Sequence, residues 1–205
     1  MKKIILIALI LAVGFSLYAN GNKEKVLLFI RHGDSEAIES MLQQEVDVMI
    51  SMLKEAGFKV IVATGSGEPI KDMSGKSTLL KPDLKLADVR VNDYVGIIMP
   101  CMAKGKRPDD PEEISLVKEA VAQGKPIAAQ HSAIFILAHA GVLEGKKYTF
   151  TNNIFRGRGA IYSGKGVVRD GYIITSAICP NAARYYGEAD GTSELTMLFI
   201  EAISE

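Results

Sequence analysis

The chain has 205 residues, of which 48% are hydrophobic and 23% are charged, and this balance suits one globular α/β domain with a sizeable core. Basic and acidic residues each number 24, so there is no basic excess of the kind that marks nucleic-acid-binding proteins. We therefore expect no nucleic-acid partner.

The first 19 residues have the form of a secretory signal peptide. Lys2 and Lys3 provide a short positive region, and an almost unbroken apolar run follows from Ile4 to Leu17. The run is short for a membrane span, and Ala19 suits cleavage; an uncleaved anchor is the alternative. We expect residues 1–19 to be removed and the protein to be periplasmic or secreted, with no stable membrane anchor after cleavage.

Strands and helices alternate along residues 25–203, which we take as one domain. Short apolar runs between turn residues predict buried strands, and longer runs with helical periodicity predict helices. The predicted strands are 26–30, 59–63, 94–99, 126–129 and 148–151 with a hairpin over 166–175, and the predicted helices are 35–56, 111–123, 132–140 and 192–203. Residues 64–93 predict a hairpin or an irregular excursion. This alternation predicts a mostly parallel sheet covered on both faces, with ligands bound beyond the carboxyl ends of its strands.

A sharp turn is expected where the strand 126–129 meets the helix 132–140, at Gln130 and His131. Such an elbow lifts one side chain above the carboxyl edge of the sheet, beside a helix N-terminus that favours negative charge. Serine or cysteine suits this position. The sequence places Gln130 there, and a carboxamide neither attacks a carbonyl nor loses a proton at useful pH.

Two cysteines, Cys101 and Cys179, each follow a predicted strand, so both sulfurs are expected near the elbow. Three interpretations compete. The thiols form a disulfide or are inert; Cys101 is a relocated nucleophile whose pKa is lowered by His131; or both cysteines and His131 bind a metal together with a carboxylate. The ligand types suit zinc, but no closely spaced Cys or His pair supports a metal site. We predict no metal and no cofactor.

Four segments carry a resemblance to a known family, and they are 94–100, 124–129, 140–146 and 168–176. Their order and spacing resemble the ThiJ/PfpI superfamily, which includes the Parkinson-disease protein and has a class I glutamine-amidotransferase-like fold. The resemblance covers residues 25–203. It implies a flavodoxin-like three-layer α/β sandwich with a mostly parallel central sheet, and a homodimer.

The chain departs from the pattern of this superfamily at the elbow. Members typically carry Cys there, often followed by His, Gly and Pro, and the corresponding residues are taken here as Gln130, His131, Ser132 and Ala133. A Glu in the first helix of members touches the elbow thiol. The resemblance places it at Glu45, with Glu39 and Glu36 as alternatives. With the elbow nucleophile replaced, the hydrolase or amidase activity of the family is not expected, and whether the chain is an enzyme stays open.

The leading hypothesis is an exported ThiJ/PfpI-type protein that binds a small ligand or partner in a cleft at the strand ends. Its expected ligand-binding residues are Gln130, Glu45, Ser132 and Cys179. The alternative is a cysteine-dependent hydrolase or an enzyme of reactive carbonyls, with Cys101 and His131 as its catalytic residues. A third class is a structural or oligomeric interaction protein without a ligand.

Overall fold

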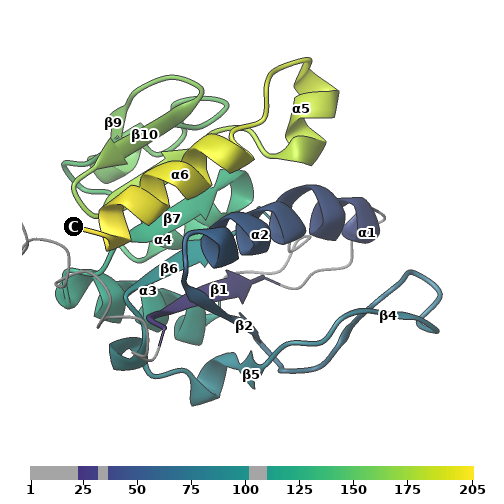
Figure 1. Cartoon of the computed structure of the whole chain (residues 1–205). Helices are drawn as coiled ribbons and strands as arrows, with labels where there is room; N and C mark the ends of the chain where they lie inside the picture. Colours follow the sequence, from purple (N-terminus) through teal and green to yellow (C-terminus); the bar gives the residue numbers. More distant parts are fainter. Residues whose placement is uncertain (1–22, 32–36, 102–109) are drawn as a thin grey trace, which may run out of the picture.

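The computed structural model describes residues 23–31, 37–101 and 110–205, and its centre is a seven-stranded sheet (Figure 1). The strand order is β10-β11-β7-β6-β1-β2-β5. The strands are β1 (Lys25–Ile30), β2 (Lys59–Thr64), β5 (Leu84–Lys85), β6 (Gly96–Met99), β7 (Ile127–Gln130), β10 (Val167–Asp170) and β11 (Ile173–Ser176). All neighbours are parallel except β10 and β11. The predicted mostly parallel sheet is confirmed.

The middle strands are apolar along their length because both faces of the sheet are covered. Every residue of β1 after Lys25 is buried, as is all of β6. Helix α6 (Thr192–Ile203) packs directly on the backbone of β6 at Gly96. A Cβ atom at Gly96 would lie 2.6 Å from Ile203 Cγ2 and 2.9 Å from the ring of Phe199, so a larger residue would push the helix off the sheet.

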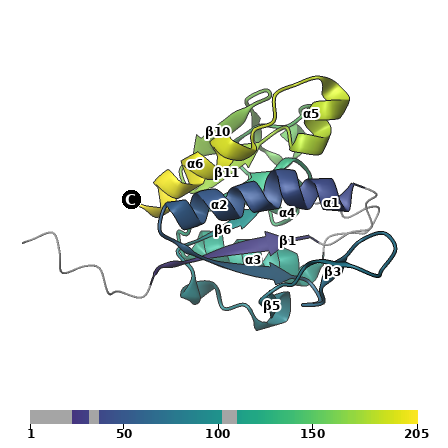
Figure 2. The same ribbon diagram turned by 45° about the vertical axis from the view of Figure 1, so that its right-hand side comes forward.

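Helices form the two outer layers (Figures 1 and 2). They are α1 (Ile38–Met41), the π-helical segment η1 (Leu42–Val46), α2 (Asp47–Glu55), α3 (Pro111–Ala122), α4 (Ile134–His139), α5 (Pro180–Tyr186) and α6. Helices α2 and α6 bury their apolar residues in the core on one face, whereas α3 and α4 contribute to the core on the other face. The three-layer sandwich is therefore confirmed.

Residues 64–93 form the expected excursion. It contains the hairpin of β3 (Ile70–Lys71) and β4 (Thr78–Leu80), the edge strand β5, and the 3-10 helices η2 (Leu86–Asp88) and η3 (Val91–Asp93). Its strand β5 pairs with β2 at the edge of the sheet opposite to β10 (Figure 2).

The predicted strand over residues 148–151 is wrong in length. The strand β8 covers only Lys147–Tyr148 and pairs with β9 (Ile161–Tyr162) in a separate two-stranded sheet. The reason is at Thr149, whose backbone N–H donates to Thr175 Oγ1 at 3.0 Å and whose hydroxyl donates to the Thr175 carbonyl at 2.9 Å. These side-chain hydrogen bonds replace the backbone ladder.

The signal peptide predicted over residues 1–19 lies outside the described residues. Within the described ranges, no helix is both long and apolar enough to cross a membrane.

Candidate functional site

The elbow between β7 and α4 is built on a strained backbone at His131. Strand β7 ends at Gln130, and the 3-10 turn η4 (His131–Ala133) leads into α4. His131 has a φ of 44°, and it is the one non-glycine with positive φ among the described residues. This left-handed conformation costs a residue with a Cβ about 1–2 kcal/mol, and such strain gathers at functional sites. The tip of the elbow is therefore His131.

The elbow tip predicted from the sequence, Gln130, lies one residue before the observed tip. Gln130 is the last residue of β7 and has an extended backbone, with φ −103° and ψ 127°. It is fully buried, and its Nε2 donates to the Ile178 carbonyl and to Thr192 Oγ1, both at 3.0 Å. Gln130 ties β7 to α6 and does not line the pocket at the elbow.

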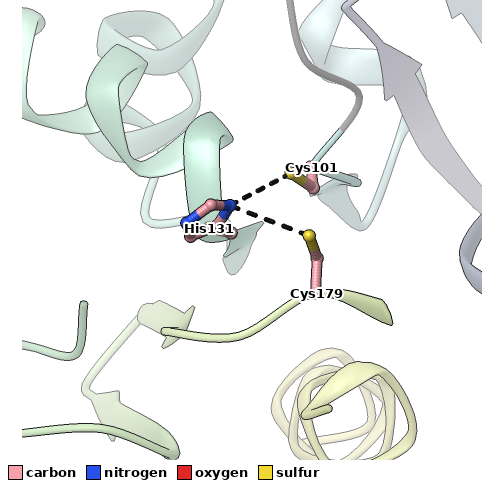
Figure 3. Close-up of side chains that lie close together, drawn as sticks. All are labelled: Cys101, His131 and Cys179. Atoms are coloured by element: carbon pink, nitrogen blue, oxygen red, sulfur yellow. Dashed lines mark hydrogen bonds between the residues drawn. The ribbon is translucent and has the colours of Figure 1, made fainter. Parts of the chain in front are cut away.

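Three side chains from different strand ends meet above the elbow: Cys101 after β6, His131 after β7 and Cys179 after β11 (Figure 3). His131 Nδ1 lies 3.3 Å from Cys101 Sγ and 3.7 Å from Cys179 Sγ. Both cysteines are free thiols and both are buried. The two sulfurs therefore lie near the elbow, as their places after strand ends predict.

Glu45 lies beneath the cluster, in the π-helical segment η1. It is fully buried, and its Oε1 accepts the backbone N–H of Cys101 at 2.5 Å, while Oε2 has no hydrogen-bond partner among the described residues. Burial raises the pKa of Glu45 well above its usual value; Cys179 raises it further, and the Cys101 N–H opposes the shift. The alternative Glu39 is exposed, and Glu36 lies outside the described residues. Glu45 thus holds the backbone of Cys101 in place.

The two thiols differ in their electrostatic environment. The hydrogen bond with Cys101 is the main influence on Cys179; with the contact to His131 and the backbone N–H of Ala182, it lowers the Cys179 pKa to about 5 against the opposing effect of burial. The same hydrogen bond, followed by burial and the nearby Glu45, raises the pKa of Cys101 well above its usual value. The environment favours a thiolate at Cys179, whereas the sequence analysis favoured Cys101 as the nucleophile.

Neighbouring side chains fix the elbow and the imidazole. The Ser132 hydroxyl donates to the Cys101 carbonyl, and its oxygen lies 3.4 Å from Cys101 Sγ. Arg31 is buried; its Nη1 donates to the Ser132 carbonyl at 2.8 Å, and its Nε lies 3.7 Å from the Glu113 carboxylate. The ring of Phe150 stacks on His131 at 5.3 Å between centroids. The imidazole is therefore held on its ring face as well as by its backbone.

A pocket of about 440 Å³ opens above this cluster. Its lining comes from the strand ends, from α1 and from α5: Met41, Cys101, His131, Ser132, Cys179, Asn181, Ala182, Arg184, Tyr185 and Tyr186. Of the predicted ligand-binding residues, Ser132 and Cys179 line it, whereas Gln130 and Glu45 do not. Helix α5 was not predicted from the sequence, although Pro180 directly after Cys179 is a helix-start signal.

The fold agrees with a comparison against known families. Residues 24–189 match the model of the DJ-1/PfpI family. The chain belongs to the DJ-1/PfpI family. The resemblance predicted from the sequence is confirmed.

Relatives of this DJ-1/PfpI chain include proteins of known structure. An uncharacterized protein of Methanocaldococcus jannaschii is 30% identical, over 91% of this chain and 94% of the relative. Drosophila melanogaster DJ-1beta is 25% identical with a TM-score of 0.59, over 89% of this chain and 91% of that chain. A ThiJ/PfpI domain protein from Brachyspira murdochii has a TM-score of 0.65 at 18% identity, over 90% and 98% of the two chains, and this likeness supports the fold alone.

Proposed function

We propose that this DJ-1/PfpI protein is exported and binds a small organic anion in the pocket above the elbow, without a hydrolase activity based on an elbow cysteine. The observation that carries the proposal is the identity of the elbow residue. The strained position at the tip belongs to His131, whose imidazole faces two sulfurs. An elbow nucleophile is replaced there by a group suited to binding or to moving a proton.

The charge of the pocket lining supports an anionic ligand. Among the described lining residues, Arg184 carries a permanent positive charge and none carries a carboxylate, while the thiolate favoured at Cys179 is buried beside His131. Arg184 is exposed, and its Nη2 donates to Gln44 Oε1, which holds the guanidinium at the rim. Tyr185 and Tyr186 from the same helix provide aromatic surface beside it. A small carboxylate with an apolar body matches this lining.

The test is a thermal-shift titration of the purified full chain with a panel of small carboxylates, such as pyruvate, lactate and citrate. At least one should raise the melting temperature saturably, and Arg184→Gln should remove that shift. The matched control is Arg156→Gln, an exposed arginine in η5 (Arg156–Arg158) outside the pocket, which should leave the shift unchanged. Loss of the shift in both variants, or no saturable shift at all, would refute an anion site.

Hydrolase and glyoxalase assays test the other half of the proposal. Casein, an aminoacyl p-nitroanilide and methylglyoxal should be turned over no faster by the wild type than by His131→Ala. Turnover that His131→Ala abolishes would show that the chain keeps a catalytic elbow.

The contact of both sulfurs with one imidazole favours a second function, a cysteine-dependent enzyme of reactive carbonyls. A thiolate at Cys179 would add to the carbonyl carbon; the C–O π bond would break, and an imidazolium at His131 would give its proton to the oxygen. Cys179→Ala should then abolish activity on methylglyoxal, whereas Cys101→Ala should reduce it in part. Equal activity of both variants and the wild type would exclude this function.

A further inference from the structure

The side chains of Cys101, His131 and Cys179 bring two sulfur donors and one imidazole nitrogen close together. The two Sγ atoms and a ring nitrogen of His131 all lie within 4.8 Å of one another. Figure 3 shows the Nδ1 of the imidazole turned toward the gap between the two sulfurs. Each donor comes from a different strand end, so the parallel sheet brings together ligands that are far apart in sequence.

The distances suit a tetrahedral zinc ion. With Zn–S bonds of about 2.3 Å and Zn–N bonds of about 2.0–2.1 Å, tetrahedral angles separate a sulfur and a nitrogen by about 3.5–3.6 Å. The separations from His131 Nδ1 are 3.3 Å to Cys101 Sγ and 3.7 Å to Cys179 Sγ, one on each side of that value. Small side-chain adjustments would be enough to place one ion between the three atoms.

Further contacts orient the donors, as the surroundings of a metal site require. Phe150 stacks on the imidazole with an interplanar angle of 17°. The buried Glu45 accepts the backbone N–H of Cys101, and Cys179 is fixed as the N-cap residue of α5. The donors are therefore held by the fold and do not depend on the ion for their arrangement.

We propose that Cys101 Sγ, His131 Nδ1 and Cys179 Sγ bind one Zn²⁺ ion, whose fourth coordination position faces the pocket. Two thiolates and an imidazole select zinc over magnesium or calcium. All three ligands line the pocket of about 440 Å³, so water or a small ligand can reach the fourth position. Three protein ligands with an open position are the pattern of catalytic rather than structural zinc. The proposal departs from our expectation of no metal, and it stands whether or not the pocket binds an organic anion.

The first experiment is a Zn²⁺ titration of the reduced, metal-stripped full chain against a chromophoric chelator, with no organic ligand present. We expect one Zn²⁺ per chain. Cys101→Ser, Cys179→Ser and His131→Ala should each weaken binding by at least about 100-fold, because loss of a direct ligand should match or exceed the 10–100-fold effect of losing an outer partner. The control His139→Ala removes an exposed histidine outside the cluster and should bind like the wild type.

Substitution with Co²⁺ identifies the donor atoms independently of affinity. The wild type should show thiolate-to-cobalt charge transfer and the intense visible bands of a tetrahedral site, and both should weaken in the two Cys→Ser variants. Circular dichroism checks that each variant is folded, and Zn²⁺ should raise the unfolding midpoint of the wild type but not that of a folded ligand variant. A Co²⁺ complex without charge transfer, or Cys→Ser variants that bind Zn²⁺ as tightly as the wild type, would overturn the site. Because these readouts need no carboxylate, a failed anion titration does not affect them.

Discussion

Gln130 joins the end of β7 to helix α6, and its replacement tests the new position of the elbow. In Gln130→Ala the Ile178 carbonyl and the Thr192 hydroxyl would lose a buried donor, and a cavity would replace the amide. We expect a loss of about 2–4 kcal/mol in the free energy of unfolding, measured by urea denaturation.

The control for this prediction is Gln123→Ala. Gln123 is exposed and its Nε2 hydrogen-bonds to the Glu119 carboxylate, so its removal should cost less than about 0.5 kcal/mol. A similar loss in the two variants would contradict a structural role for Gln130.

At the scale of single residues, the sequence predicted the turn after β7 correctly but not the residue at its tip. The run Pro126–Ala129 predicts a strand that ends before Gln130, whereas the strand includes Gln130. Hydrophobic periodicity cannot detect this, because a polar side chain at a strand end reads as the start of a turn. What keeps Gln130 in the strand is a pair of hydrogen-bond acceptors, Ile178 and Thr192, that arrive from distant parts of the chain.

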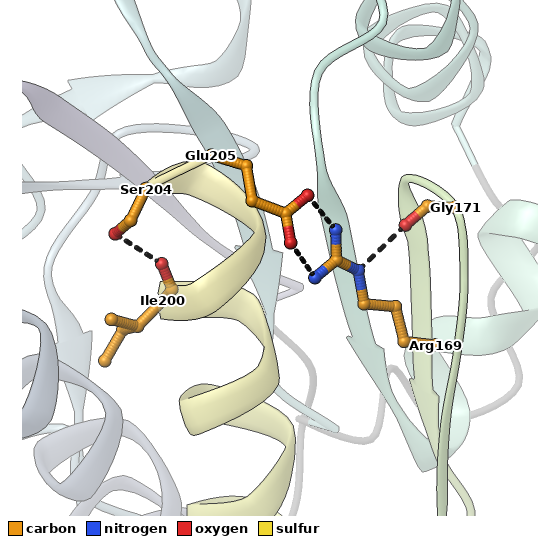
Figure 4. Close-up of polar contacts among 5 residues, drawn as sticks. All are labelled: Arg169, Gly171, Ile200, Ser204 and Glu205. Carbon is orange, nitrogen blue, oxygen red and sulfur yellow. Dashed lines mark hydrogen bonds and ion pairs between the residues drawn. The ribbon is translucent and has the colours of Figure 1, made fainter.

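An ion pair connects Glu205, just after the end of α6, to Arg169 in the edge strand β10 (Figure 4). Arg169 Nη1 and Nη2 donate to the two carboxylate oxygens of Glu205 at 2.7 and 2.6 Å. The hydrogen bonds with Arg169 lower the pKa of Glu205, so the carboxylate stabilises the fold above its usual pKa, and this contribution is lost as pH falls through the folded-state pKa.

We therefore predict that Glu205→Gln lowers the melting temperature at pH 7 and that the difference shrinks on acidification toward pH 3. The pair is solvent-exposed, so the decrease should not exceed about 3 °C. Thermal unfolding of both proteins across this pH range measures it. Glu68→Gln, at an exposed loop position, is the control and should show no such pH-dependent difference. A difference that is constant with pH would contradict the ion pair.

Elements with strong local signals could be predicted, and those that depend on distant contacts could not. Helix α3 begins with Pro111 and has a capping box between Asp110 and Glu113. Both are local signals, so the start of the helix can be predicted from the sequence. The strand β8 is shortened by hydrogen bonds between Thr149 and Thr175, which lie far apart along the chain. Tertiary contacts of this kind override local β-propensity.

At the scale of the whole molecule, the parallel sheet is what creates the site. Because β6, β7 and β11 run in the same direction, the residues that follow them lie at one edge. This rule alone predicted that Cys101 and Cys179 would lie near the elbow. It could not predict that both sulfurs contact one ring nitrogen of His131, since that depends on the strained backbone at the tip.

The proposed export would place Cys101 and Cys179 in an oxidising compartment, where free thiols are readily oxidised. A bound zinc ion would protect the two thiols from oxidation. We predict that the chain, produced with its first 19 residues in a bacterial host, appears in the periplasm or medium with Asn20 as its first residue. N-terminal sequencing and intact mass measure this. Lys2→Glu with Lys3→Glu should reduce export, because a signal peptide needs a positive start, whereas Lys54→Glu with Lys118→Glu should not. Exported protein that still begins with Met1 would contradict cleavage.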